Sequence, residues 1–244
     1  MTESQKINNH QLDILAFGAH ADDVEIGMAG TIAKYTKNGW RIGICDLTKA
    51  ELSSNGTTLL RYEEAKNAAS ILGVSIRENL QFPDRGLFLQ QEYIRKVSYV
   101  IRKYKPTYIF TPYEIDRHPD HGNCTSIVEQ AVFSAGIKNY QVDEQLPAHK
   151  VSNVFYYFIN GFHKSTFMID ISETIIEKIH SLEAYKSQFT KTTYSVDTPL
   201  VNGYVELVKN RERLFGSEVG VEFAEGFISK KPILLGEGLL GEKR

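Results

Sequence analysis

Cysteine is scarce in this chain, whose 244 residues include only Cys45 and Cys124. Two thiols exclude a disulfide framework and a cysteine-rich zinc site, so we expect both to be small buried residues. No apolar run approaches the roughly 18 residues that a membrane-spanning helix needs. The segment 1–11 is polar and lacks the apolar stretch of a signal peptide. We therefore expect a cytoplasmic protein with no membrane partner.

An excess of either charge is also absent, since 28 basic and 30 acidic residues give a formal net charge of −2. No segment concentrates lysine or arginine, which argues against nucleic acid or anionic lipid as a partner. The first expected strand-to-helix turn lacks a Gly-x-Gly-x-x-Gly pattern and carries two carboxylates that would repel phosphates. A nucleotide-binding module is therefore the weaker alternative from a different functional class.

Apolar runs alternate with helical patterns from residue 12 onwards. Strand-like segments at 12–17, 40–47, 75–80 and 107–111 are separated by helical segments at 24–35, 59–69 and 92–104. This order predicts an α/β fold, a Rossmann-like three-layer α/β/α sandwich with a mainly parallel sheet.

The last third of the chain is less regular. We expect a helix that ends near residue 136, further helices at 173–189 and 203–215, and strands at 151–159 and 219–227. No repeat or linker divides the chain, which predicts one domain over residues 1–244 with 1–11 as a flexible N-terminal extension. The loop 137–149 is a candidate lid or subunit contact.

Two histidine-containing motifs follow strand-like segments. Ala19-His20-Ala21-Asp22-Asp23 follows the first strand, and His118-Pro119-Asp120-His121 follows the strand at 107–111. Chemistry in open α/β sheets lies at the carboxyl ends of the strands, so the two motifs can converge on one divalent metal. His20, Asp23 and His121 supply two imidazoles and a carboxylate, which suit Zn²⁺ and leave positions open for water and substrate. The same donor types also describe an Fe²⁺ site.

The remaining side chains of these motifs suggest hydrolytic chemistry. Consecutive side chains diverge, so Asp22 stays free when Asp23 binds a metal, and it is placed to take a proton from metal-bound water. His118 can stabilise a tetrahedral oxyanion or protonate a leaving amine if Asp120 or another acid orients and charges it. The first motif alone also fits a helix N-cap whose acids favour the positive end of the helix dipole. A purely structural metal is a further alternative.

The two motifs, read as 18–23 and 117–121, resemble those of the PIG-L/LmbE-like zinc N-deacetylases. The resemblance extends through 46–48, 53–57, 83–86 and 224–227 to the bacillithiol-biosynthesis branch. It implies removal of acetate from N-acetylglucosaminyl malate, or alternatively from N-acetylglucosamine or chito-oligosaccharides, by a homo-oligomer that is often a hexamer. Many relatives have proline where this chain has Ala21, but alanine also occurs in the bacillithiol-like branch.

The resemblance also implies residue roles. His20, Asp23 and His121 correspond to the zinc ligands and Asp22 to the general base. His118 corresponds to the residue that stabilises the transition state or acts as an acid. Tyr204 is the best match to a tyrosine that approaches the oxyanion.

Substrate contacts follow from the charge of the expected substrate. A malyl group carries two carboxylates, which arginine binds in a bidentate manner, and Arg61, Arg85 and Arg117 each lie next to a motif. Asp84 can accept hydrogen bonds from sugar hydroxyls, and His163 lies in a glycine-containing turn that is expected to border the site. Turn formation and ordinary ion pairs explain the arginines and Asp84 equally well.

Overall fold

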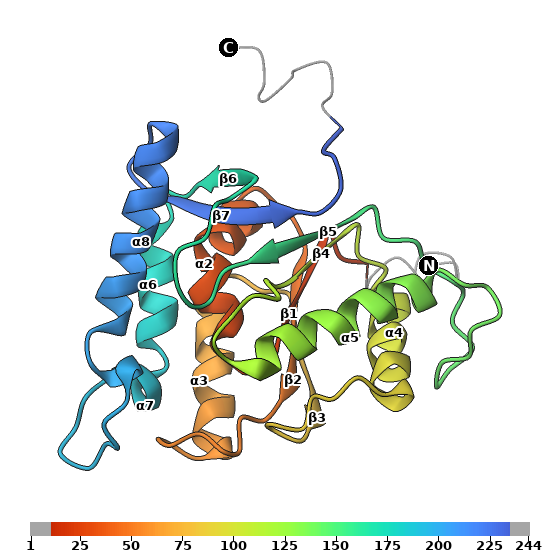
Figure 1. Cartoon of the computed structure of the whole chain (residues 1–244), viewed down its shortest axis with the longest axis horizontal. Helices are drawn as coiled ribbons and strands as arrows, with labels where there is room; N and C mark the ends of the chain where they lie inside the picture. The colour runs from red at the N-terminus through yellow and green to blue at the C-terminus, as the bar shows by residue number, and fades with distance from the viewer. Residues whose placement is uncertain (1–10, 235–244) are drawn as a thin grey trace, which may run out of the picture.

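A computed structural model describes residues 11–234 (Figure 1). The expected flexible extension, 1–11, lies outside the described residues except for Gln11. The strands are β1 (Ile14–Gly18), β2 (Ile42–Thr48), β3 (Ile76–Phe82), β4 (Tyr108–Pro112), β5 (Asn153–Tyr157), β6 (Phe167–Asp170) and β7 (Ala224–Ser229). The helices are α2 (Asp23–Lys37), α3 (Thr58–Ile71), α4 (Gln91–Tyr104), α5 (Pro119–Ala135), α6 (Ile175–Glu183), α7 (Lys186–Phe189), the short 3₁₀ helix η2 (Pro199–Val201) and α8 (Tyr204–Val219).

The strands form a seven-stranded sheet in the order β3-β2-β1-β4-β5-β7-β6. The strands β1 to β5 pair in parallel, whereas β7 runs antiparallel to its neighbours β5 and β6. Ile14 of β1 pairs with Ile42 on one side and with Tyr108 on the other. This topology confirms the predicted α/β fold with a mainly parallel sheet.

Alternating side chains of the central strand β1 divide the core between two faces. Leu15 and Phe17 pack in a cluster with α4 and α5. Ile14 and Ala16 pack in a second cluster with α2, α6 and α8 on the opposite face (Figure 1). Both faces of a parallel sheet need such a cover, which explains the nearly continuous apolar character of these strands.

The helices that follow β1 and β4 lie on opposite faces of the sheet, although the two strands are neighbours. In open α/β sheets, a crevice forms at the carboxyl ends of two neighbouring strands when the connections that follow them cross to opposite faces of the sheet. The connections after β1 and β4 carry the two histidine-containing motifs. The fold therefore brings both motifs to the same crevice.

The last third differs from the sequence prediction in its details. The expected helix at 173–189 is divided into α6 and α7, and the strand β6 was not predicted. The helix α8 continues to Val219, where Gly220 ends it with a φ of 77°, so β7 begins only at Ala224. The predicted strand at 219–227 therefore begins five residues too early, because the glycine stop was not recognised.

The loop 137–149 is held at the amino ends of the strands. The guanidinium of Arg102 donates hydrogen bonds to the carbonyl oxygens of Ile137, Tyr140 and Leu146. A ring nitrogen of His149 lies 2.7 Å from the carbonyl oxygen of Pro106, which precedes β4. The prediction that this loop is a lid is wrong, because the loop lies at the amino ends of the strands and the crevice lies at their carboxyl ends. A role in subunit contact stays a prediction.

Both cysteines are buried and unpaired, as expected. Between residues 11 and 234, no helix combines the length and apolar character required to cross a membrane.

Candidate functional site

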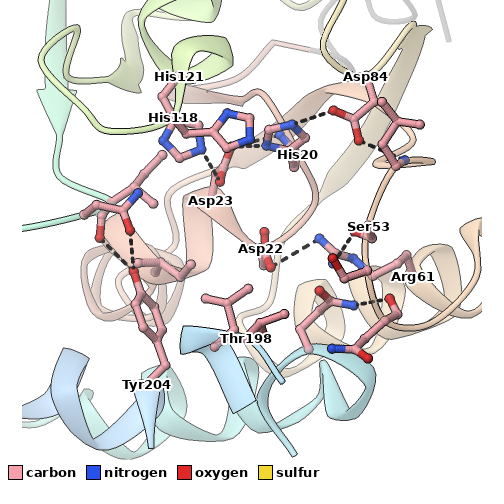
Figure 2. Close-up of a pocket in the computed structure, with 18 of the residues that line it drawn as sticks. His20, Asp22, Asp23, Ser53, Arg61, Asp84, His118, His121, Thr198 and Tyr204 are labelled. Carbon is pink, nitrogen blue, oxygen red and sulfur yellow. Dashed lines mark hydrogen bonds and ion pairs between the residues drawn. The ribbon is translucent and has the colours of Figure 1, made fainter. Parts of the chain in front are cut away.

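A cavity of about 250 Å³ opens at the carboxyl ends of β1 and β4 (Figure 2). His20, Asp22 and Asp23 reach it from the turn between β1 and α2, and His118 and His121 from the start of α5. In Figure 2, the imidazoles of His20, His118 and His121 lie side by side at one wall. The short turns after neighbouring parallel strands therefore place these motif residues around one space.

Asp23 lies between two imidazoles. One carboxylate oxygen is 3.2 Å from Nε2 of His121, and the other is 3.5 Å from Nδ1 of His20 and accepts a hydrogen bond from the backbone N–H of His20. Burial raises the pKa of Asp23, but the charge and hydrogen bond of His121 and the contacts with His20 outweigh burial and hold this pKa well below its usual range. Asp23 is therefore an ionised carboxylate with two imidazole partners.

The opposite nitrogens of both imidazoles face further carboxylates. Nε2 of His20 is 3.2 Å from Asp84 and 3.6 Å from Asp120, and Nδ1 of His121 is 2.9 Å from Asp116. Burial lowers the pKa of His20, but hydrogen bonds with Asp120, Asp23 and Asp84 raise it well above its usual value. For His121, burial is likewise outweighed, chiefly by Asp23 and Asp116, and the pKa rises to about 9.

This donor arrangement fits a divalent metal. Nitrogen atoms of His20, His118 and His121 lie within 4.8 Å of one another, and a second group with the same spacing joins His20 to Asp84 and Asp120. Metal-binding histidines commonly direct one ring nitrogen to the metal and the other to a carboxylate. The contacts of His20 and His121 follow that pattern around Asp23.

Asp22 occupies an unusual backbone conformation beside the metal-binding candidates. It precedes α2 with a φ of 112°, in the left-handed region that residues other than glycine rarely adopt. Its carboxylate is 3.2 Å from the guanidinium of Arg61. Burial raises the pKa of Asp22 to about 7, with Arg61 opposing the shift and Asp23 adding to it. A carboxyl group with such a pKa can both accept and release a proton near neutral pH.

His118 caps the start of α5. Its Nδ1 accepts a hydrogen bond of 3.3 Å from the backbone N–H of Asp120, so the proton of the neutral ring resides on Nε2. Burial, together with the charges of His20 and His121, lowers the pKa of His118. The ring centre lies 4.8 Å from each of the other two imidazoles. His118 is therefore suited to donate a hydrogen bond as a neutral imidazole.

The carboxylate of Asp120 binds Arg85 and is not hydrogen-bonded to His118, which differs from the predicted orienting contact. Its fully buried carboxylate accepts hydrogen bonds from the backbone N–H and the guanidinium of Arg85, at 2.7 and 3.1 Å, and lies near His20. Its charge raises the pKa of His118, but burial and the charges of His20 and His121 outweigh this effect, and Asp120 is not among the residues that line the cavity. A turn that comes from the distant end of β3 captures this side chain, which the motif alone could not reveal.

The predicted substrate-binding residues Arg61, Asp84, Arg85 and Arg117 all line the cavity, as does Tyr204. Arg61 is only 3% exposed and bonds Asp22, the carbonyl oxygen of Ala21 and the hydroxyl of Ser53. Arg85 and Arg117 are exposed. Arg61 therefore holds the turn that contains Asp22, whereas the other two arginines remain accessible to a ligand.

Tyr204 is largely buried and approaches the cavity from α8. Its hydroxyl donates to the carbonyl oxygen of Ile159 at 3.1 Å and lies 3.3 Å from the side-chain oxygen of Asn160. Burial raises the pKa of Tyr204 to about 12, so the hydroxyl keeps its proton at neutral pH.

The prediction that His163 borders the site is wrong. Its ring packs against Tyr113 and Phe158, and Nε2 lies 3.2 Å from the carbonyl oxygen of Asn160. The ring is not among the groups that line the cavity. The glycine-containing turn therefore directs this side chain behind the wall of the site.

Asp116 and Asn160 are among the residues at the site that were not predicted. Asp116 accepts hydrogen bonds from the backbone N–H of His118 at 2.8 Å and from the side chain of Asn160 at 2.9 Å, and it also contacts His121. Asn160 lies just beyond β5 and accepts a hydrogen bond from Arg117 at 3.0 Å. An acid two residues before His118 is a turn signal that could have identified Asp116, since aspartate binds backbone N–H groups at this spacing. No local signal identifies Asn160.

Comparisons with known proteins find similarity over most of the chain. The PIG-L family model (GlcNAc-PI de-N-acetylase) matches residues 15–132. Diacetylchitobiose deacetylase of Thermococcus kodakarensis is 30% identical over 237 residues, which cover 91% of this chain and 85% of that protein. The crystal structure of the conserved protein TT1542 from Thermus thermophilus is 35% identical with a TM-score of 0.84, and the match covers 93% of this chain and 98% of that chain. N,N'-diacetylchitobiose deacetylase from Pyrococcus horikoshii shares the fold, with 22% identity, a TM-score of 0.78, and coverage of 92% and 88%.

Proposed function

Because this chain belongs to the PIG-L family of de-N-acetylases, we propose that it is a metal-dependent hydrolase that removes the N-acetyl group from an N-acetylglucosamine derivative. The observation that carries the proposal is one cavity that contains both an ionised Asp23 between His20 and His121 and a separate acid, Asp22, whose pKa is raised to about 7. The first group suits a metal, and the second suits proton transfer.

His20, Asp23 and His121 are the residues that would hold the metal. When bound, a divalent metal such as Zn²⁺ or Fe²⁺ supplies Lewis-acid polarisation of the acetyl carbonyl and lowers the pKa of water to about 7. Asp84, Asp116 and Asp120 orient the two imidazoles through the nitrogens that face away from Asp23.

The other residues carry out the proton transfers and stabilise charge. Asp22, held by Arg61, accepts a proton from the attacking water and returns it to the nitrogen of the departing amine. Nε2–H of His118 donates a hydrogen bond to the acetyl oxygen and stabilises the negative charge that develops there. Tyr204 lines the cavity from α8, and its protonated hydroxyl can donate to the same oxygen once it releases the carbonyl oxygen of Ile159. Acetate and a free amino sugar are the products.

For the substrate, we propose N-acetylglucosaminyl malate. Arg85 and Arg117 are exposed guanidinium groups at the same cavity, and a malyl group carries two carboxylates for which arginine is the best-shaped partner. The second candidate is an uncharged chito-oligosaccharide. It is favoured by the 30% identity with a diacetylchitobiose deacetylase over 91% of the chain.

Acetate release from N-acetylglucosaminyl malate, diacetylchitobiose and N-acetylglucosamine, each with and without a chelator, tests the proposal. We expect the malyl substrate to have the highest kcat/KM and the chelator to abolish every activity. The double variant R85Q/R117Q should lose activity mainly on the malyl substrate, through a raised KM. A higher kcat/KM on diacetylchitobiose than on N-acetylglucosaminyl malate would favour the chito-oligosaccharide as the substrate. Acetate release that is insensitive to the chelator would contradict the metal-dependent reaction itself.

The proposal retains the single domain and the homo-oligomer that the sequence and its family resemblance predict. Light scattering of the purified protein measures the oligomeric state.

A further inference from the structure

The helix that carries Asp23 is broken shortly after its first turn. Met28 has a φ of −151° and a ψ of 21°, which are not helical values. The turn that contains Asp23 therefore lies between the left-handed Asp22 and this kink. The kink divides α2 into this first segment and a longer second one.

Charged side chains from other elements bind the backbone groups that the kink releases. The carboxylate of Glu225, in β7, accepts hydrogen bonds from the backbone N–H groups of Gly30 and Thr31, at 2.9 and 2.7 Å. Lys178 and Arg211 both donate to the carbonyl oxygen of Ile26 at 2.8 Å. The carboxylate of Glu225 thus binds the amino end of the second segment of α2. The cationic side chains of Lys178 and Arg211 bind the carboxyl end of the first segment, and the helix dipoles favour both arrangements.

These charges form one buried network. Lys178, Glu212 and Glu225 have no exposed surface. Nζ of Lys178 is 2.6 Å from Glu225 and 3.0 Å from Glu212, and Glu212 is 2.7 Å from Arg211. Buried ion pairs are often no more stabilising than apolar residues of the same volume. Stability of the core therefore does not by itself explain these four residues.

The network reaches the walls of the cavity only through the backbone. Arg211 also donates to the carbonyl oxygen of Ile159 at 2.9 Å, and the side chains of Ile26 and Ile159 line the cavity. The backbone N–H of Ile26 in turn donates to the carbonyl oxygen of Asp22 at 2.9 Å. No member of the network is itself among the groups that line this cavity.

We propose that Glu225, together with Lys178 and Arg211, positions the first turn of α2 so that Asp23 meets His20 and His121 while Asp22 faces the reacting water. The three are positioning residues, because they act through the backbone at Ile26, Gly30 and Thr31. This inference rests on the proposed function, but it also predicts an effect on metal affinity that does not require knowledge of the substrate.

The test compares E225Q with R102M in the full chain. The amide of E225Q can accept only one of the two N–H groups and presents a donor to the other. Arg102 is a matched control, because it is also buried and also binds several backbone carbonyl oxygens. It lies at the amino ends of the strands, far from the cavity at their carboxyl ends. Zn²⁺ affinity is measured by competition with a chromophoric chelator, kcat and KM by acetate release, and stability by thermal unfolding.

Both variants should lose stability, but only E225Q should lose site geometry. We expect E225Q to weaken Zn²⁺ binding and to lower kcat by about 10- to 100-fold, with KM little changed, as for residues that orient metal ligands. R102M should retain both values. The conservative variant R211K keeps the charge beside Glu212 but cannot reach both Ile26 and Ile159, and it should fall between E225Q and the wild type.

Wild-type Zn²⁺ affinity and kcat in folded E225Q and R211K would overturn the inference. If E225Q does not fold, R211K alone decides it by the same measurements. If the wild-type protein releases no acetate from any acetylated amino sugar, the proposed function fails, while the Zn²⁺ affinities still test the positioning role.

Discussion

Asp22 and Asp23 are adjacent in the chain but ionise in opposite ways. Burial affects both carboxyl groups, yet Asp23 has two imidazole partners whereas the main influences on Asp22 are Arg61 and the like charge of Asp23. The pKa of one is therefore held well below its usual range and that of the other rises to about 7. Neighbouring acids whose pKa values diverge in this way serve different chemical roles.

This difference predicts separable effects of two substitutions. Asp22→Asn should leave Zn²⁺ content near that of the wild type but reduce kcat by about 100-fold or more, because the proton acceptor is lost. His121→Ala should lose Zn²⁺ as well as activity. Metal analysis of the purified variants, combined with acetate release, separates the two cases. A zinc-replete, fully active Asp22→Asn variant would exclude Asp22 as the base.

At the scale of residues, the sequence predicts which motifs come together better than it predicts the hydrogen-bond partner of each side chain. His20, Asp23 and His121 come together as expected, because each motif follows a strand and the strands are parallel neighbours. Asp120 was assigned to His118 because the two are close in sequence. Its actual partner, Arg85, comes from the turn after β3, and only the tertiary fold determines that contact.

Among the elements, α2 is the one whose packing constrains the site most closely. A Cβ atom at Gly27 would lie 2.0 Å from the ring of Tyr157. Tyr157 is fully buried, and its hydroxyl donates to the carbonyl oxygen of Phe17 at 2.7 Å, so the ring has little room to move. Glycine here permits the close approach of α2 to β5.

Gly27→Ala should therefore lower the free energy of unfolding by about 1 to 3 kcal/mol, as overpacked substitutions do. Urea denaturation measures the change. The sign of the change in the free energy of unfolding is informative, because replacing glycine by alanine in a helix interior otherwise stabilises the fold by about 1 kcal/mol.

Gly136→Ala is the matched control. Gly136 has a φ of −78°, and its Cβ would meet no atom closer than 3.5 Å. This substitution should be neutral or stabilising by less than about 1 kcal/mol. Equal effects of the two substitutions would contradict the packing argument.

The elements from β1 to α5 were predictable, because buried parallel strands give apolar runs and the intervening helices have clear periodicity. The strand β6 was not, since Phe167–Asp170 is four residues long and lies at an edge of the sheet. The kink at Met28 was also unpredictable. It depends on Glu225 and Lys178, which are distant in sequence, and the helical pattern continues through it.

For the whole molecule, the proposed metal site is separate from the packing that holds the fold together. Extensive apolar clusters cover both faces of the sheet, whereas the donors lie in turns at its edge. The protein should therefore remain folded without metal. Metal that binds only the native state adds stability by mass action.

Zn²⁺ at 100 times its dissociation constant should raise the free energy of unfolding by about 2.7 kcal/mol. For a chain of this size, that corresponds to a rise in Tm of about 5 to 11 °C. Thermal unfolding in chelator and in excess Zn²⁺ measures the shift. The His121→Ala variant should show a much smaller shift, and an equal shift in that variant would place the ion elsewhere.

The adjacency of β1 and β4 would also affect how a newly made chain acquires the proposed metal. His20 and Asp23 leave the ribosome before His121, which follows only after three further strands have been translated. Until then, an ion has only an incomplete set of side chains to bind. Loading would therefore be a late step in biogenesis, and an ion captured by the nascent chain would exchange freely until the α5 segment has docked.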